Sequence, residues 1–319
     1  MHLLQVCNVG NICGGTAACA WSITRALDGW THSVLSLSPP TAETAHAFAP
    51  VNIEQRSMIT RREVLQLKPD VVLLHNTAAS RVQTSLGVFT MQYLHSRIEP
   101  ARADVTVACS QWLRTQFSPE IVDGVLYQPV HGPFAGNGAA DDALAGPFTV
   151  GRICTPHRKK WPSELIPLYA HWAERHPQVT WEFVGCPADL QVRLHRACRS
   201  QAAFWPAEWS ARRHLLRWNA LLYHHPSLTE TFGRTVAEAL QASCIPIVDD
   251  RGGFREQLER GGGYLCRTMT DFDVALIDLQ QAPQHNRLSQ RAREIGHARF
   301  SGPAFATRFQ QLLRTYVEV

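Results

Sequence analysis

The chain has 319 residues, of which 45% are hydrophobic and 18% charged, and its formal net charge is +4. This length accommodates two domains of ordinary size, and no apolar run approaches the ~20 residues that a membrane-spanning helix requires. The basic residues are spread along the chain rather than clustered with aromatic residues, which argues against a nucleic-acid-binding surface.

The first segments alternate between strand and helix patterns. Residues 2–6 predict a buried strand, the turn after it contains Gly14 and Gly15, and residues 16–27 predict a helix. A strand, a glycine-rich turn and a helix are typical of a Rossmann-like domain. The spacing is not GxGxxG, so a dinucleotide fingerprint is absent. The glycine pair fits equally well a turn that approaches a ligand and a tight turn with no ligand.

Polar residues follow the next two predicted strands. Residues 68–74 form a strand pattern that ends in His75 and Asn76, and residues 88–94 form another that ends in His95. Ligands bind at the carboxyl ends of parallel strands, so His75 and Asn76 are candidates for substrate contacts. Alternatively, they are a loop histidine and an asparagine that caps the next helix.

The pattern then changes in a segment rich in Gly, Ala, Asp and Pro. Residues 104–108 and 122–127 predict the last strands of the first domain, and Ser110 between them predicts a helix N-cap. Residues 131–147 read as a linker. After it a strand–helix–strand pattern recurs over residues 148–185, which predicts a second doubly wound domain.

The restart carries a group of cations. Arg152 follows a glycine at the end of the first strand pattern, and Arg158, Lys159 and Lys160 come shortly afterwards. A cluster of this kind is usually a solvated basic loop. A phosphate-binding pattern further along the chain favours a functional interpretation, with Lys160 preferred because a helix follows it.

That pattern lies within residues 229–265. Glu230 precedes a helix entry at Gly233, Glu238 lies inside the helix, and Thr229 and Thr231 are candidate caps. Amides at a helix N-terminus attract phosphate. Carboxylates beside a phosphate cradle would repel phosphate, so they are expected to accept hydrogen bonds from hydroxyls. A ligand with phosphate in its middle and hydroxyls at both ends is a nucleotide sugar.

Glu230 and Glu238 are separated by seven residues, Phe-Gly lies between them, and Glu238 begins the sequence Glu-Ala-Leu. This pattern resembles the donor-binding signature of family 4 retaining glycosyltransferases. Residues 245–248, 252–256 and 262–265 follow in the order of that family. The resemblance implies an α/β chain of GT-B fold, with two Rossmann-like doubly wound domains facing a central cleft. It also implies catalytic residues in four positions, His95, Arg152, Lys160 and Glu230. The donor-binding residues implied by it are Gly14, Gly15, Thr231, Phe232, Gly233, Arg234, Thr235 and Glu238.

The function expected from this resemblance is transfer of a sugar from a UDP- or GDP-sugar to an acceptor hydroxyl with retention, by an enzyme of hexosyltransferase type. No Asp-x-Asp metal site is seen, so no metal and no cofactor are expected. The acceptor, a saccharide, a lipid-linked sugar or a small molecule, stays open. Alternatives are a nucleotide-sugar-binding protein of the same fold without transferase activity, a nucleotide-sugar epimerase, and an oxidoreductase, which the missing fingerprint argues against.

The expected domains are an acceptor-side domain over residues 1–130 with a returning helix at about 302–319, the linker, and a donor-binding domain over 148–301. The nine cysteines are odd in number and lack CxxC spacing, which is typical of buried, reduced thiols. We therefore expect a cytoplasmic protein without a signal peptide, with at most weak peripheral contact at the inner face of a membrane through basic residues.

Overall fold

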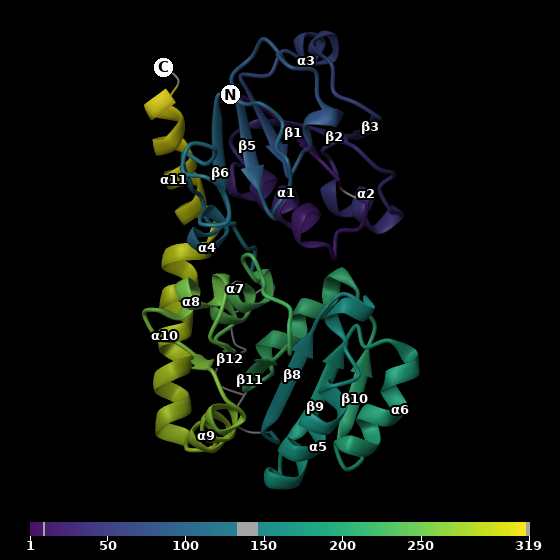
Figure 1. Cartoon of the computed structure of the whole chain (residues 1–319), viewed down its shortest axis with the longest axis vertical. Helices are drawn as coiled ribbons and strands as arrows, with labels where there is room; N and C mark the ends of the chain where they lie inside the picture. The colour runs from purple at the N-terminus through teal and green to yellow at the C-terminus, as the bar shows by residue number, and fades with distance from the viewer. Residues whose placement is uncertain (9, 133–145, 317–319) are drawn as a thin grey trace. The chain divides into compact units, whose positions relative to one another are not determined.

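The computed structural model describes residues 1–8, 10–132 and 146–316 (Figure 1). It divides into two compact units, one formed by Met1–His131 with Arg299–Val319, the other by Gly132–Ala298. Most of the predicted linker lies outside the described residues. The acceptor and donor roles assigned to the two domains stay predictions.

The first unit is built on a seven-stranded parallel sheet, in the order β3-β2-β1-β4-β5-β6-β7. Its strands are β1 (His2–Cys7), β2 (Thr31–Ser36), β3 (Ile53–Gln55), β4 (Val71–His75), β5 (Thr90–Leu94), β6 (Val105–Ala108) and β7 (Gly124–Val125). The strand predicted over residues 122–127 is thus reduced to two residues at the sheet edge. β1, β4, β5 and β6 are buried almost throughout, as their continuous apolar runs predict for a sheet covered on both faces.

Several helices of the first unit begin at side-chain N-caps. The helices of this unit are α1 (Gly15–Ala26), α2 (Ala42–Phe48), α3 (Arg61–Leu67), η1 (Ala79–Arg81), α4 (Gln111–Arg114) and α11 (Gly302–Tyr316). Ser110 accepts a hydrogen bond from the Leu113 amide, which confirms its predicted role as N-cap of α4. The C-terminal helix α11 lies against α1, and the Phe309 ring is 5.9 Å from that of Trp30.

The second unit repeats this architecture with a six-stranded parallel sheet, in the order β10-β9-β8-β11-β12-β13. Its strands are β8 (Thr149–Ile153), β9 (Thr180–Val184), β10 (Ala202–Trp205), β11 (Ala220–Tyr223), β12 (Ile245–Asp249) and β13 (Tyr264–Cys266). Its helices are η2 (Arg158–Lys160), α5 (Leu165–Arg175), α6 (Ala188–Ala197), η3 (Trp209–Leu216), α7 (Arg234–Gln241), α8 (Gly253–Leu258), α9 (Met269–Leu279) and α10 (Ala282–Phe300), whose last two residues belong to the first unit.

Aromatic side chains fill the core beneath α5. The Tyr169 ring meets those of Trp172, Trp181 and Phe183 at centroid distances of 5.2, 5.3 and 4.8 Å, each close to perpendicular. Burying a side chain of this size stabilises the fold by roughly 1.5–3 kcal/mol. Seven of the nine cysteines are also buried, as predicted.

The strand orders place one switch point in each sheet. β1 continues to β2 and β3 on one side and to β4 on the other, and β8 has β9 and β11 on its two sides in the same way. Loops that leave neighbouring strands at such a point diverge to opposite faces, which opens a crevice at the carboxyl ends of the strands. Most of the predicted site residues lie in the loops that follow β1, β4, β8 and β11.

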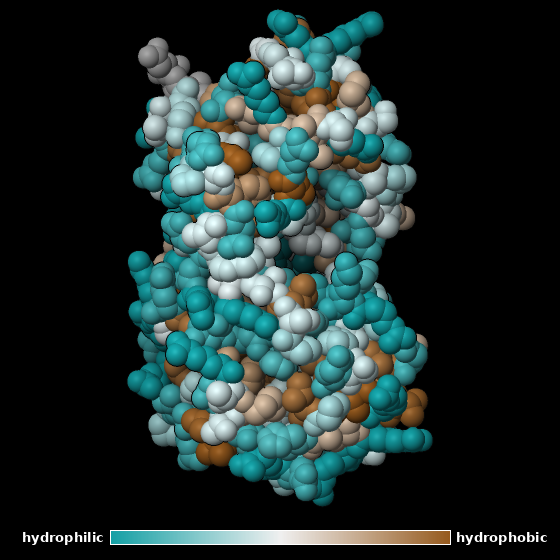
Figure 2. Space-filling model, in the orientation of Figure 1, coloured by the Kyte–Doolittle hydropathy of each residue, from teal (hydrophilic) through white to brown (hydrophobic). Residues whose placement is uncertain are grey.

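The described helices include none with both the length and the apolar composition needed to cross a bilayer. On the face of the molecule shown in Figure 2, hydrophobic residues are interspersed with hydrophilic ones.

Candidate functional site

An ion pair joins the two loops at the switch point of the second unit. Lys160 ends η2, which follows β8, and its ammonium contacts Oε1 of Glu230 in the loop after β11. The Tyr223 hydroxyl donates to the same carboxylate oxygen. Both members of the pair keep about a fifth to a quarter of their side-chain surface exposed, so a small ligand can reach them. The fold therefore brings together two residues that are seventy positions apart.

The neighbouring cations differ from Lys160 in their contacts. Arg158 forms an ion pair with Asp189 of α6, and Lys159 is exposed. Of the three cations that the sequence left open as phosphate ligands, Lys160 is the one that lies against Glu230.

Arg152 is placed differently from the sequence expectation, which put it in the loop with these cations. It lies within β8 and is completely buried, because the strand runs two residues further than its pattern indicated. Its guanidinium donates to the carbonyl oxygens of His224 and Lys160, each at 2.8 Å. It also lies over the Tyr223 ring at 4.6 Å and the Trp161 ring at 5.1 Å. Arg152 thus fixes the loops that carry the ion pair.

The Glu230 loop is supported by the two glycines after β12. The Gly253 amide donates to the Glu230 carbonyl at 3.0 Å. Gly252 has φ +60°, and a Cβ on it would lie 2.5 Å from the same carbonyl oxygen. The close approach of the two backbones therefore requires glycine, and it sets the position from which the Glu230 side chain projects.

Helix α7 begins at Gly233, which has φ +84° and lies against the Phe254 ring. The prediction that Thr229 or Thr231 caps this helix is wrong, because the N-cap is Gly233, which has no side chain to accept a capping hydrogen bond. Glycine is favoured at a position with this left-handed conformation, because it has no Cβ. The Phe232 ring is buried in the unit, so this residue can offer a ligand its backbone rather than its side chain.

The first turn of α7 contains the remaining predicted donor-binding residues. The amides of this turn carry the positive end of the helix dipole. The amides of Arg234 and Thr235 belong to this turn, and the Thr235 side chain is partly exposed while that of Arg234 is buried. The helix starts a few residues after Glu230, so the anion-attracting end and the carboxylate occur in one short segment.

Glu238, one turn further, is buried between two arginines. Its Oε1 accepts from Nε of Arg212 at 2.9 Å and from Arg234 at 3.4 Å. The Arg212 guanidinium lies 3.3 Å from the centre of the Trp209 ring. The sequence analysis missed Arg212, although an arginine in the tryptophan-rich stretch around residues 205–213 was a signal for it. The arginines neutralise a carboxylate that burial alone would disfavour.

The segment of residues 205–218 forms hydrogen bonds with a buried carboxylate on β9. Glu182 accepts, through one oxygen, from Nε1 of Trp205 and Trp218, from His214 and from Arg217, at 2.7 to 3.1 Å. Burial raises the pKa of Glu182. Hydrogen bonds from His214 and Trp218 and the charges of Arg217 and His214 lower the pKa by more, so the net shift is downward.

The adjacent aspartates at the end of β12 take part in ion pairs. Asp249 accepts from His224 at 2.6 Å and pairs with Arg251 at 3.0 Å. Asp250 pairs with Arg255 at 2.7 Å and with Arg267. These carboxylates hold the strand end and the following turn together.

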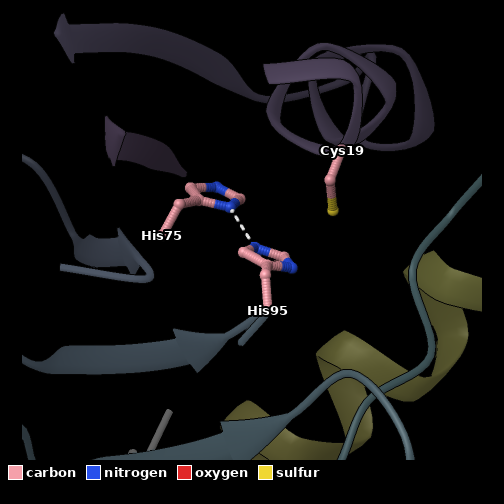
Figure 3. Close-up of side chains that lie close together, drawn as sticks. All are labelled: Cys19, His75 and His95. Atoms are coloured by element: carbon pink, nitrogen blue, oxygen red, sulfur yellow. Dashed lines mark hydrogen bonds between the residues drawn. The ribbon is translucent and has the colours of Figure 1, made fainter. Parts of the chain in front are cut away.

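In the first unit, Gly14 and Gly15 start α1 after β1, and the two histidines lie at the ends of the neighbouring strands β4 and β5 (Figure 3). His75 Nδ1 is 3.0 Å from His95 Nε2, and the rings are stacked. Burial lowers the pKa of His75 to about 3, so it is neutral. The structure therefore joins the two histidines that the sequence analysis treated as separate candidates.

Asn76 adopts a left-handed backbone conformation with φ +48°. Its Oδ1 accepts from the amides of His95 and Ser96, each at 3.0 Å, and its Nδ2 donates to the Ser96 hydroxyl at 2.8 Å. It thus holds the end of β5 rather than capping η1. Substrate contact by His75 or Asn76 stays a prediction.

Two similar parallel-sheet units, each with its loops gathered at a switch point, define the GT-B fold, and solved structures support this over the whole chain. HepE from Anabaena, in complex with UDP and glucose, matches with a TM-score of 0.74 at 16% identity, covering 99% of this chain and 100% of that one. A glycosyltransferase from Rickettsia africae matches with a TM-score of 0.74 at 12% identity, covering 99% and 98%. Sucrose-phosphate synthase from Thermosynechococcus elongatus matches with a TM-score of 0.66 at 14% identity, covering 99% of each chain. These likenesses establish the fold alone.

The class of protein follows from a family model described as "Glycosyl transferases group 1", which matches residues 154–295. All of these residues lie in the second unit, and they include Lys160, Glu230 and Glu238. The chain is accordingly an enzyme, a transferase of the glycosyltransferase class. No curated protein sequence matches it.

Proposed function

We propose that this glycosyltransferase moves a hexosyl group from a UDP- or GDP-sugar to an acceptor hydroxyl, with retention and without a metal ion. The observation that carries the proposal is the meeting of Lys160 and Glu230 at the switch point of the second unit, a few residues before the N-terminus of α7. A cation, a carboxylate and the positive end of a helix are thereby within one short stretch of structure.

The charges assign roles to these groups. Lys160 and the first-turn amides of α7 stabilise the negative charge that develops on the departing diphosphate. Glu230 accepts hydrogen bonds from hydroxyls of the transferred sugar. Its pairing with Lys160 holds the carboxylate and the ammonium in position until the donor arrives.

Glu238 is assigned to the ribose hydroxyls of the nucleotide. Its Oε1 is shared by Arg212 and Arg234, which fixes the carboxylate at one rotamer and lowers the cost of burying it. Arg152 is assigned a positioning role, because its guanidinium bonds to the Lys160 carbonyl. We also propose that His95 has a catalytic role.

Donor binding is tested with a thermal-shift panel of UDP- and GDP-sugars, led by UDP-glucose because HepE has been solved with that compound. A donor present at 100 times its Kd stabilises the folded state by about 2.7 kcal/mol. Lys160→Met should abolish most of this stabilisation. Lys159→Met is the matched control, since it removes an exposed cation one residue away and should leave the shift unchanged.

Turnover separates binding from chemistry. Removing a group that stabilises developing charge costs about 3–4 kcal/mol, or a 10²–10³-fold loss in kcat, and we expect this for Lys160→Met with an identified acceptor. Equal rates for the Lys160 and Lys159 variants would remove the assignment.

Stereochemistry, metal dependence and the epimerase alternative have separate readouts. NMR of the product reports whether the anomeric configuration of the donor is kept, and the rate should be the same with and without added Mg²⁺ or Mn²⁺, the ions that would otherwise neutralise the diphosphate. Conversion of the donor to its epimer without any acceptor would instead identify an epimerase. We propose a cytoplasmic location with at most weak peripheral membrane contact, and fractionation of cells tests both.

A further inference from the structure

A cluster in the first unit combines one thiol and two imidazoles. Cys19 lies on α1, His75 ends β4 and His95 follows β5, and all three are buried. One potential ligand atom from each lies within 4.8 Å of those of the other two. Figure 3 shows the Cys19 side chain extending from its helix toward the two histidine rings.

The hydrogen bonds fix the protons on the two rings. The Gln5 amide nitrogen donates to the Ala20 carbonyl at 3.2 Å, so its Oε1 accepts from His75 Nε2 at 2.8 Å. His75 Nδ1 is then the acceptor, and it receives the proton of His95 Nε2. His95 Nδ1 in turn accepts from the Gln128 amide at 2.8 Å. Both imidazoles are therefore neutral, the form that binds metals.

We propose that Cys19 Sγ, His75 Nδ1 and His95 Nε2 form a site for one soft divalent metal ion of the zinc type. A thiolate with two imidazoles selects Zn²⁺, Co²⁺ or copper over Mg²⁺, Ca²⁺ and Mn²⁺, which prefer oxygen ligands. Three protein ligands leave the fourth tetrahedral position for water or another ligand.

The distances suit this coordination. Two nitrogens bound to tetrahedral zinc at about 2.0–2.1 Å lie about 3.3 Å apart, and His75 Nδ1 and His95 Nε2 are already 3.0 Å apart. A bound nitrogen and sulfur lie about 3.6 Å apart, and Sγ of Cys19 is within 4.8 Å of one ring nitrogen of each histidine. A small opening of the rings and a movement of the thiol of about 1 Å complete the site.

Outer hydrogen bonds needed by metal-bound histidines are present or nearly so. Ligating histidines donate their second ring proton to an oxygen, and His75 Nε2 already donates to Gln5. When His95 Nε2 binds the metal, its proton moves to Nδ1, and Gln128 must turn its amide so that the oxygen faces the ring. The Cys19 thiol loses its proton to solvent. One proton is released for each ion bound, so metal affinity rises with pH.

Cobalt titration of the chelator-treated full-length protein tests the site. We expect one equivalent of Co²⁺ to produce the visible bands of a tetrahedral ion and the near-ultraviolet charge-transfer band of a cobalt thiolate, and Zn²⁺ to displace it. Cys19→Ser should lose the charge-transfer band. Cys244→Ser, which alters a buried cysteine of the second unit, should keep it.

Gln128→Glu supplies a test of the outer hydrogen bond. A carboxylate accepts the His95 Nδ1 proton without an amide turn, so metal affinity should rise about tenfold or more. An unchanged band in folded Cys19→Ser, or no tetrahedral cobalt spectrum in the wild type, would overturn the proposal. If Cys19→Ser does not fold, His95→Gln decides, because retention of the tetrahedral bands in that variant would also overturn it. These readouts do not depend on donor binding or turnover.

Discussion

Replacing Arg152 by methionine removes the group that connects the two loops of the second unit. Methionine fills most of the space between the Tyr223 and Trp161 rings, so the change mainly deletes the two hydrogen bonds to the carbonyls of His224 and Lys160. The loops after β8 and β11 then lose their common anchor, and the Lys160–Glu230 ion pair loses its support.

The magnitude follows from those two bonds. A buried acceptor left without a donor costs about 1–3 kcal/mol, and both carbonyls lie in partly buried surroundings, so we expect a loss of about 2–4 kcal/mol. For a domain of about 150–250 residues, each kcal/mol lowers Tm by about 2–4 °C. The Kd for the donor should rise at least tenfold, since the loop carrying Lys160 is no longer fixed.

Urea unfolding followed by tryptophan fluorescence measures the stability. Six of the nine tryptophans, Trp161, Trp172, Trp181, Trp205, Trp209 and Trp218, lie in the second unit and report on it. The midpoint should fall with an unchanged slope. Arg291→Met, on the surface of α10 with its side chain half exposed, is the control and should change stability by no more than ~1 kcal/mol.

Arg152→Lys distinguishes positioning from charge. Lysine keeps the positive charge but lacks the planar fork that reaches two carbonyls, so it should recover only about half of the lost stability and little of the donor affinity. Wild-type donor affinity in Arg152→Lys, with a loss only in Arg152→Met, would show that charge is what matters and would refute the positioning argument.

Three further predictions concern local structure. Gly233→Ala places a Cβ 2.3 Å from the Phe254 ring at a φ of +84°, whereas the Cβ of Gly29→Ala meets nothing within 4 Å. Thermal unfolding should show a loss of stability of ~2 kcal/mol or more for Gly233→Ala and under ~1 kcal/mol for Gly29→Ala. Similar losses for the two variants would contradict the geometry. Asn76→Ala should lower the free energy of unfolding by ~2–4 kcal/mol, because two backbone amides lose their acceptor and alanine is strained at φ +48°. Asn76→Gly should recover about 1 kcal/mol of this loss, since glycine is not strained there. Equal stability of the two variants in urea would exclude strain. The folded state lowers the pKa of Glu182, so the stability that this carboxylate contributes is present above the unfolded pKa of about 4.3 and is lost as pH falls through the lower folded pKa. The urea midpoint, plotted against acidic pH, should therefore change less steeply for Glu182→Gln than for the wild type. Parallel plots would remove Glu182 as the cause.

Local sequence patterns predicted much of the architecture. Continuous apolar runs identified β1 and β5 to within about two residues and β4 to within three, because strands buried on both faces must be continuously apolar. Ser110 was identified as a cap for the same local reason. The boundaries were less accurate where tertiary packing decides them, as in β7, which pairs over two residues at the sheet edge.

The capping of α7 shows the limit of local chemistry. Two threonines flanking Glu230 have the side chains that cap helices, yet the helix begins at Gly233, because the chain there packs against Phe254 and must take a positive φ. The need for this conformation comes from a residue twenty-one positions further along the chain.

By itself, the sequence determined the alternation of strands and helices, the two parallel sheets and the segment with Glu230, Gly233 and Glu238, since these depend on residues close together along the chain. Tertiary structure alone decided which distant side chains meet: Lys160 with Glu230, Arg212 with Glu238, and Cys19 with the two histidines. It also decided that Arg152 is buried and bonded to carbonyl oxygens. The physical reason is that side-chain pairing and burial depend on strand order and on which loops leave the sheet at the same point, and neither is encoded in any short stretch of residues.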